Sequence, residues 1–137
     1  MPKVSICIPT YNQVFYLRKT LESILNQTFT DYEIIITDDS SDDSVKKLIA
    51  EFDFAGKLKY YHNEPSLGSP KNWNYSLSKA SCKYIKVLHH DDWFSSSKSL
   101  QSMVDLLESS PECGFVFCGC DNLTADGRLL FYHGINE

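Results

Sequence analysis

Residues 32–43 read YEIIITDDSSDD, and the fold can be worked out from this stretch. Its first six residues form a nearly continuous apolar and β-branched run, the pattern of a strand that a parallel sheet covers on both faces. The run breaks abruptly into the polar stretch that starts at Asp38. Ser41 or Asp42 can cap a helix that follows, with acidic residues at its positive end. The buried stripe of this predicted helix comprises Val45, Leu48, Ile49 and Phe52.

The same alternation of strand and helix continues on both sides of this stretch. The pattern predicts further strands at 4–8, 58–61, 84–88 and 115–118, the first of them ended by Pro9, which has no backbone donor. Helices are expected from about 14 to 27, from 70 with Trp73, Leu77 and Ala80 on its apolar face, and from 97 to 109. A turn at Asp126-Gly127 predicts a returning strand over 129–132. The fold class is therefore α/β, a mainly parallel sheet with helices on both faces.

Length, charge and cysteine content narrow the possibilities further. The 137 residues fit one compact domain, and a net charge of −5 gives no positive field to attract nucleic acid or anionic lipid. No apolar run approaches the roughly 20 residues needed to span a bilayer, and the first residues lack the core of a signal peptide, so a cytoplasmic location is expected. Five scattered cysteines, an odd number, favour reduced and mostly buried thiols over a disulfide framework.

Polar residues follow three of the predicted strands. Pro9-Thr10-Tyr11 follow the first strand, Asp38-Asp39 the second and Asp91-Asp92 the fourth, so these groups converge on the carboxyl edge of the sheet, where ligands bind in such folds. Adjacent aspartates repel one another, and keeping both ionised requires a cation, backbone donors or good solvation. Mg²⁺ or Mn²⁺ with a bound diphosphate would satisfy them. A solvated turn or a helix cap explains Asp38-Asp39 equally well.

Other metal and phosphate sites are less favoured. His89 and His90 could each ligate zinc, but neighbours on a strand point to opposite faces, so we do not expect both to bind one ion. Cys113, Cys118 and Cys120, with His133, have the residue types of a zinc site but not its spacing. Neither a dinucleotide-binding fingerprint nor a P-loop occurs.

Several of these pieces occur together, in order, in one known family. The stretches VSICIPTYN (4–12), LESILNQT (21–28) and EIIITDDSSD (33–42), then Gly68, Lys71-Asn72 and Asp91-Asp92, resemble glycosyltransferase family 2. The resemblance runs from Val4 to Cys120 and covers the N-terminal, nucleotide-sugar-binding portion of the family. It implies the Rossmann-like GT-A fold.

The resemblance also implies roles for single residues. Pro9, Thr10 and Tyr11 would form a wall around the nucleotide base, and Asp38 or Asp39 would hydrogen-bond the base or ribose. Lys71 would meet a phosphate as a point charge. The pair Asp91-Asp92 stands where the family has its DxD-type motif, with Asp92 as the direct metal ligand and Asp91 contacting donor and metal. In this chain the position two before Asp92 is His90 instead of Asp.

The implied reaction is an inverting, metal-dependent transfer of a sugar from a nucleotide diphosphate, with UDP expected, to a glycan, lipid-linked or protein acceptor. The family's general base lies in its acceptor half. None of the later carboxylates Asp121, Asp126 and Glu137 stands in a base motif, so we expect residues 1–137 to be a single donor-binding domain without the acceptor-binding C-terminal part. It is either a fragment or a naturally short homologue, with acceptor chemistry that is incomplete or supplied by a partner.

The family also suggests a setting: polysaccharide or glycoprotein assembly with a membrane-proximal acceptor at the inner face of the membrane. Exposed apolar residues near 115–137 would favour self-association. A non-catalytic nucleotide-binding or interaction module that retains the fold is the alternative. A phosphoacceptor signalling domain is disfavoured, because it needs an acidic pair after the first strand, where this chain has Pro9-Thr10-Tyr11.

Overall fold

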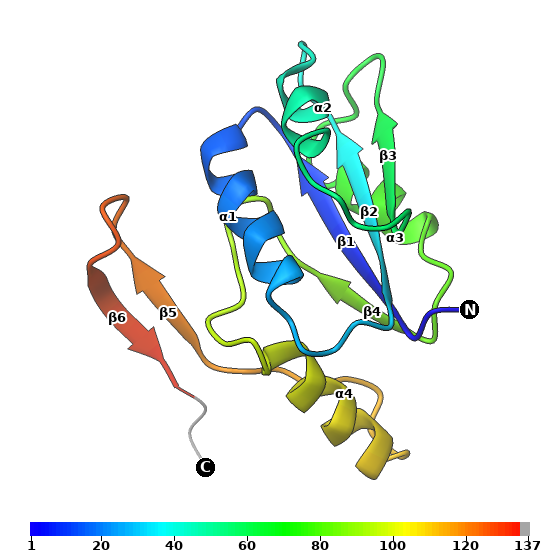
Figure 1. Cartoon of the computed structure of the whole chain (residues 1–137), viewed down its shortest axis with the longest axis vertical. Coiled ribbons are helices and arrows are strands. Elements are labelled where there is room, and N and C mark those ends of the chain that lie inside the picture. The colour runs from blue at the N-terminus through cyan, green and yellow to red at the C-terminus, as the bar shows by residue number, and fades with distance from the viewer. Residues whose placement is uncertain (135–137) are drawn as a thin grey trace. The chain divides into compact units, whose positions relative to one another are not determined.

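The computed structural model describes residues 1–134, which form two compact units (Figure 1). The first unit comprises residues 1–100 and the second begins at residue 101. Helix α4 (Ser99–Ser109) starts at the end of the first unit and continues into the second. No helix within residues 1–134 is long and apolar enough to cross a membrane.

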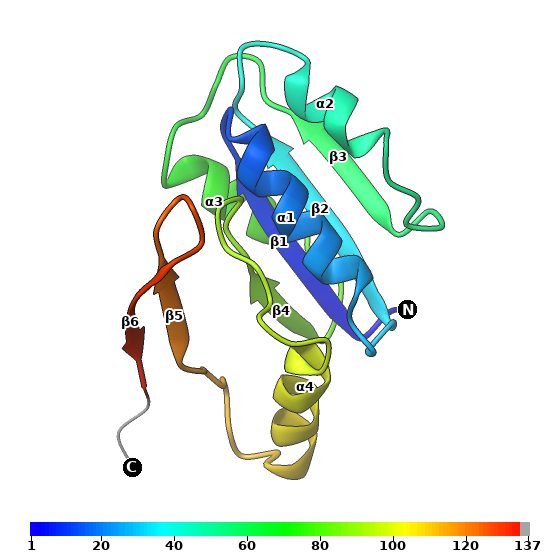
Figure 2. The ribbon, with the colours of Figure 1, turned by 60° about the vertical axis from the view of Figure 1, so that its left-hand side comes forward.

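The first unit is built on a parallel four-stranded sheet. Its order is β3-β2-β1-β4, and the strands are β1 (Val4–Thr10), β2 (Tyr32–Asp38), β3 (Leu58–His62) and β4 (Tyr84–Val87). Helices α1 (Val14–Leu25) and α2 (Ser44–Ile49) lie on one side of this sheet and α3 (Lys71–Ser78) on the other (Figure 2). Every residue of β1 and β2 is buried, as the apolar run at residues 32–37 predicts. The predicted α/β class with a mainly parallel sheet is confirmed.

Strand β1 is longer than predicted. Pro9 does not end it, because Pro9 pairs with Thr37 and Thr10 pairs with Asp38 of β2. The ladder between β1 and β4 ends at the pair Cys7 and Val87, so at Pro9 the strand has a partner on one side only. A proline is tolerated where one side of a strand needs no donor.

Helix α3 buries a different face from the predicted one. Trp73 and Leu77, expected in the core, are 43% and 36% exposed, whereas Asn72 and Ser76 are buried. The Asn72 amide donates to the carbonyls of Thr10 (3.3 Å) and Thr37 (3.0 Å) at the ends of β1 and β2. The buried side predicted from the apolar periodicity of this helix is therefore wrong. The carbonyls at the strand ends need hydrogen-bond donors, so a polar side chain is buried there.

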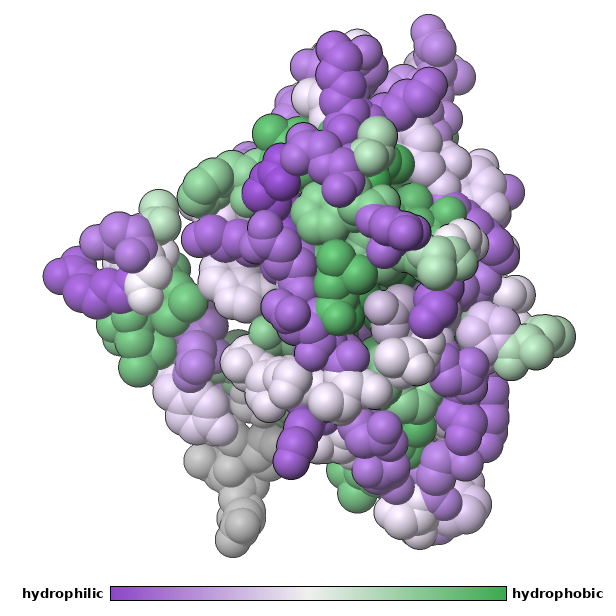
Figure 3. Space-filling view, viewed as in Figure 1, coloured by the Kyte–Doolittle hydropathy of each residue, from purple (hydrophilic) through white to green (hydrophobic). Residues whose placement is uncertain are grey.

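The second unit contains an antiparallel hairpin, β5 (Cys120–Leu123) and β6 (Leu129–His133). The returning strand is confirmed, but its partner is not the predicted segment 115–118, which forms no strand. The backbone N–H of Thr124 donates to Arg128 at 2.8 Å, and this tight turn sets the register that pairs Cys120 with His133. Leu129, Leu130, Phe131 and Tyr132 are more than half exposed, and Figure 3 shows a hydrophobic patch on part of the hairpin, next to hydrophilic residues at its turn.

The cysteines are all free thiols, as expected, but most are not buried. Cys7 is buried and Cys82 half-buried, whereas Cys113, Cys118 and Cys120 are exposed. The latter three lie in the second unit, which buries little of its surface, so the expectation of mostly buried thiols is wrong for them.

Candidate functional site

An open cavity of about 710 Å³ lies at the carboxyl ends of β1, β2 and β4. Its lining comes from these strand ends, the loop after β3 and the start of α3: Pro9, Thr10, Tyr11, Asp39, Ser66, Gly68, Ser69, Asn72, Trp73, His89, His90, Asp91 and Asp92. Between β1 and β4 the order of strands in the sheet reverses relative to the chain. This is the position where open α/β sheets bind their ligands.

The Asp91-Asp92 pair lies in a turn directly after β4, and both residues are exposed. The backbone N–H of Asp92 donates to the His89 carbonyl at 3.0 Å, which closes the turn. His90 Nδ1 lies 3.1 Å from the Pro9 carbonyl. Because a carbonyl only accepts, Nδ1 carries the hydrogen, so His90 ties the turn to the end of β1.

Of the two aspartates at the end of β2, Asp39 is the one that lines the cavity. It is 5% exposed and accepts hydrogen bonds from the Asn63 amide (2.7 Å) and the backbone N–H groups of Leu67 (3.0 Å) and Gly68 (2.7 Å). Burial alone would raise the pKa of Asp39, but these donors, together with the Ser66 hydroxyl, lower it below its ordinary value. Asp39 therefore stays ionised at neutral pH and holds the 63–68 loop against the cavity.

Asp38 is completely buried and does not line the cavity. Its carboxylate accepts hydrogen bonds from the Ser40 hydroxyl (2.6 Å) and backbone N–H (2.9 Å), the Tyr60 hydroxyl (2.8 Å) and the Thr10 hydroxyl (3.1 Å). Burial and the bond to Asp38 raise the pKa of Tyr60. Of the two aspartates that the sequence left as alternatives, the interior one thus serves the packing of β1, β2 and β3.

Aromatic side chains form another part of the cavity wall. Tyr11 is 57% exposed, and the ring of Trp73 lies 4.6 Å, centroid to centroid, from that of His89. Flat exposed rings offer stacking surfaces to a planar base or to the apolar face of a sugar. Sequence reasoning missed Trp73 because its spacing resembled that of a core position.

The structure brings six of the predicted donor-site residues together and leaves two outside. Those at the cavity are Pro9, Thr10, Tyr11, Asp39, Asp91 and Asp92. Asp38 lies in the interior, and Lys71 is exposed at the first position of α3 without lining the cavity. Ser66, Ser69 and His89 line it in addition, and the motif Lys71-Asn72 was the one signal that could have pointed to Asn72.

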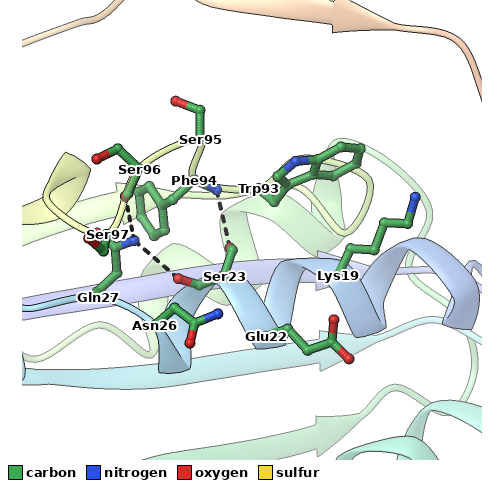
Figure 4. A pocket seen from close by; sticks show the side chains of 10 residues that line it. All are labelled: Lys19, Glu22, Ser23, Asn26, Gln27, Trp93, Phe94, Ser95, Ser96 and Ser97. Atoms are coloured by element: carbon green, nitrogen blue, oxygen red, sulfur yellow. Dashed lines mark hydrogen bonds between the residues drawn. The ribbon is translucent and has the colours of Figure 1, made fainter. Parts of the chain in front are cut away.

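A second cavity, of about 400 Å³, lies between α1 and the segment that follows the Asp91-Asp92 turn (Figure 4). Lys19, Glu22, Ser23, Asn26 and Gln27 line one side, and residues 93–97 line the other. The Lys19 ammonium lies 5.2 Å from the centre of the Trp93 ring. Nothing in the sequence predicted this cavity.

The described residues hold no metal site made of protein groups alone. Within residues 1–134, no three or more His, Cys, Asp and Glu side chains gather so that they could hold an ion.

Comparison with known proteins agrees with the geometry. The sequence model of glycosyl transferase family 2 matches residues 5–133. A Campylobacter jejuni GalNAc(5)-diNAcBac-PP-undecaprenol beta-1,3-glucosyltransferase is 37% identical over 94 residues, 67% of this chain and 30% of that protein. The putative teichuronic acid biosynthesis glycosyltransferase TuaG of Bacillus subtilis is 28% identical over 94% of this chain and 51% of its own length.

Solved structures share the fold. The crystal structure of Staphylococcus aureus TarS 1–349 in complex with UDP-GlcNAc superposes with a TM-score of 0.71 at 26% identity, covering 80% of this chain and 32% of that one. The mannosyltransferase PcManGT of Pyrobaculum calidifontis, solved with GDP-Man and Mn²⁺, has a TM-score of 0.68 at 20% identity over 77% of this chain and 32% of its own, and shows the shared fold alone. The chain spans between 13% and 51% of the length of the curated relatives compared. A family match over nearly the whole chain, together with a GT-A-like sheet, establishes that this chain belongs to glycosyl transferase family 2.

Proposed function

We propose that this chain is the donor-binding part of an inverting glycosyltransferase and that it holds a nucleotide-diphosphate sugar in the 710 Å³ cavity. One observation carries the proposal. The Asp91-Asp92 turn, the Asp39 carboxylate and the Pro9–Tyr11 strand end, far apart in sequence, line one cavity at the switch point of the sheet.

UDP is the proposed nucleotide. The TarS structures with UDP-GlcNAc and with UDP are 26% identical to this chain, and that level of similarity supports a UDP-linked donor here. Pro9, Thr10 and Tyr11 would form a wall around the nucleotide base. The ionised Asp39 would accept a hydrogen bond from the imide N–H or from a ribose hydroxyl. Lys71 is next to Asn72, a cavity residue, and would supply positive charge to a phosphate.

The residues of the Asp91-Asp92 turn fit a hard divalent cation. Both carboxylates are exposed at the cavity, and Mg²⁺ or Mn²⁺ commonly binds through one or two carboxylates and completes its shell with water and substrate phosphates. Asp92 would be the direct ligand, and Asp91 would contact both ion and donor. When bound, the cation would offset the negative charge of the nucleotide-diphosphate leaving group.

The chain's own residues would prepare the donor for attack and leave proton removal to another part of the enzyme. Asp39 holds the 63–68 loop and is assigned to the base or ribose, and Asp91 and Asp92 are assigned to the cation, so no cavity carboxylate remains for the acceptor hydroxyl. We place the general base in an acceptor-binding part beyond this domain, opposite the leaving group, as in-line inversion requires.

The proposed acceptor is a lipid-linked or cell-surface glycan. The names of the C. jejuni and B. subtilis relatives, which refer to an undecaprenol-linked glycan and to teichuronic acid, support this class. Such acceptors would place the reaction at the inner face of the membrane, with the donor drawn from the cytoplasm. The exposed hairpin residues 129–132 would favour self-association.

Calorimetric titration tests donor binding directly. The 137-residue chain is titrated with UDP, GDP and UDP-GlcNAc, each with and without Mn²⁺. We expect UDP and UDP-GlcNAc to bind more tightly with Mn²⁺ than without it, and GDP to bind more weakly than UDP. Absence of binding by any nucleotide, with the fold intact by circular dichroism, would favour a module that has kept the fold without donor binding.

A further inference from the structure

One face of α1 and the turn after it is polar where it meets the segment that carries the Asp91-Asp92 turn. Thr20, Ser23, Gln27 and Thr28 provide this face. Each of them hydrogen-bonds a backbone group within residues 90–100. Because these contacts are made to backbone groups, they determine the path of the chain whichever side chains it carries.

Thr20 makes the contact nearest to the acidic pair. It is completely buried, and its hydroxyl oxygen lies 2.7 Å from the Asp92 carbonyl and 3.1 Å from the His90 carbonyl. A helical threonine commonly donates to the carbonyl four residues before it, and that of Tyr16 is 3.2 Å away. Its single proton can serve one acceptor at a time, and the Asp92 carbonyl is the closest.

Gln27 and Ser23 hold the segment that follows. The Gln27 amide is 5% exposed, donates to the Ser96 carbonyl at 2.8 Å and accepts from the backbone N–H of Leu100 at 2.9 Å. The Ser23 hydroxyl accepts from the backbone N–H of Phe94 at 3.1 Å, and Figure 4 shows both side chains turned toward this segment. These hydrogen bonds therefore hold the chain in place directly after the acidic pair.

We infer that Thr20 is a positioning residue for the Asp91-Asp92 turn, and that Ser23 and Gln27 anchor the segment behind it. Asp91 and Asp92 are exposed, so packing does not fix them. The carbonyls that Thr20 reaches belong to the residues at positions 90 and 92, on either side of Asp91. A turn that is already ordered loses less conformational entropy when its carboxylates bind a cation.

This inference rests on the proposed function, because it assigns the benefit of the ordered turn to cation-dependent donor binding. Without the Thr20 hydroxyl, the turn would have to be ordered at the moment of binding. The entropy cost of ordering the turn would weaken UDP binding in the presence of the cation. It would not weaken the binding that the base makes with residues Pro9–Tyr11.

The experiment compares Thr20→Val, which keeps the shape and removes the hydroxyl, with Thr20→Ser, which keeps the hydroxyl. Ser5→Ala is the matched control: Ser5 is also completely buried, and its hydroxyl bonds Glu33 near the start of β1. UDP affinity is measured with saturating Mn²⁺ and with no metal. We expect Thr20→Val to lose about tenfold with Mn²⁺, the usual size of one lost hydrogen bond, and to change less than about twofold without it.

Backbone hydrogen exchange over residues 89–97 supplies a second measurement that needs no ligand. We expect faster exchange there in Thr20→Val but not in Thr20→Ser or Ser5→Ala. Unchanged exchange in Thr20→Val would overturn the positioning role. Equal loss of affinity with and without Mn²⁺, or the same pattern in Ser5→Ala, would reduce Thr20 to a general structural residue. Wild-type protein that binds UDP without any Mn²⁺ effect would overturn the proposed cation and the link to it, while the exchange data would still decide the positioning role.

Discussion

The Glu33 carboxylate lies 2.7 Å from the Lys59 ammonium, across the parallel pair β2 and β3. Glu33 is buried in the sheet, and its other oxygen accepts hydrogen bonds from the Ser5 hydroxyl (2.7 Å) on β1 and from Ser81 before β4 (2.8 and 3.0 Å). One side chain therefore joins β1, β2, β3 and the chain entering β4, near the ends of the strands opposite to the cavity.

Glu33 should make the stability of the fold depend on pH in acid. Burial alone would raise the pKa of Glu33, but the bonds from Lys59, Ser5 and Ser81 lower it to about 2, from an ordinary value of 4.5. A carboxyl with a depressed pKa stabilises the fold above its ordinary pKa, and this contribution is lost as pH falls toward the folded-state value. We expect Glu33→Gln to cost about 1–3 kcal/mol at pH 7, and the difference from wild type to shrink between pH 5 and pH 2.

Urea unfolding at several pH values measures this difference. Glu51→Gln is the control, because Glu51 forms an ion pair with Arg18 at 2.7 Å in which both side chains are about half exposed. Such surface pairs contribute little. A Glu33→Gln difference that stays constant down to pH 2 would contradict the assignment.

Asp92 should carry the cation dependence of donor binding. Asp92→Ala removes a cavity carboxylate without touching the core, so we expect Mn²⁺-dependent UDP binding to be abolished and the melting temperature to stay nearly unchanged. Asp42→Ala is the control, because Asp42 is an exposed carboxylate whose hydrogen bonds come from the backbone N–H and the hydroxyl of Ser44 near the start of α2. Equal effects of the two substitutions on calorimetric titrations would refute the metal assignment.

Asp38 and Asp39 are neighbours in sequence, yet we expect them to fail in different ways. The N–H groups of Leu67 and Gly68 bond different oxygens of Asp39, so Asp39→Asn would place a donor opposite one of these two N–H groups. The 63–68 loop should therefore loosen and UDP affinity fall about tenfold. Asp38→Asn would disturb the interior bonds to Ser40 and Tyr60 and cost about 2 kcal/mol in stability. At a temperature where the Asp38→Asn variant is folded, its UDP affinity should stay within about twofold of wild type. A loss of UDP affinity in Asp38→Asn together with a loss of stability alone in Asp39→Asn would contradict this assignment of the two aspartates.

The sequence predicted the first unit far better than the second. The buried run at 32–37 and the polar strand ends were enough to predict a parallel sheet and a site at its edge, because both follow from local pattern and from general rules of α/β topology. The predictions that were wrong depended on tertiary structure. They concerned the end of β1 at Pro9, the face of α3 that meets free carbonyls, and the segment that pairs with β6. The choice between Asp38 and Asp39 also depends on three dimensions, since both follow the same strand and only the positions of Tyr60 and Asn63 separate an interior carboxylate from a cavity carboxylate.

The two tryptophans of the chain provide a spectroscopic test of where the donor binds. Trp73 lines the 710 Å³ cavity and Trp93 lines the 400 Å³ cavity beside α1. In a Trp93→Phe variant the fluorescence comes from Trp73, and we expect UDP with Mn²⁺ to change its intensity because a base or phosphate enters its surroundings. In a Trp73→Phe variant the remaining Trp93 emission should change far less, and UDP affinity should fall severalfold because the smaller ring offers less stacking surface at the cavity. A response confined to Trp93 would move the donor to the cavity beside α1, where Lys19 and Glu22, and not the Asp91-Asp92 turn, would have to account for its binding.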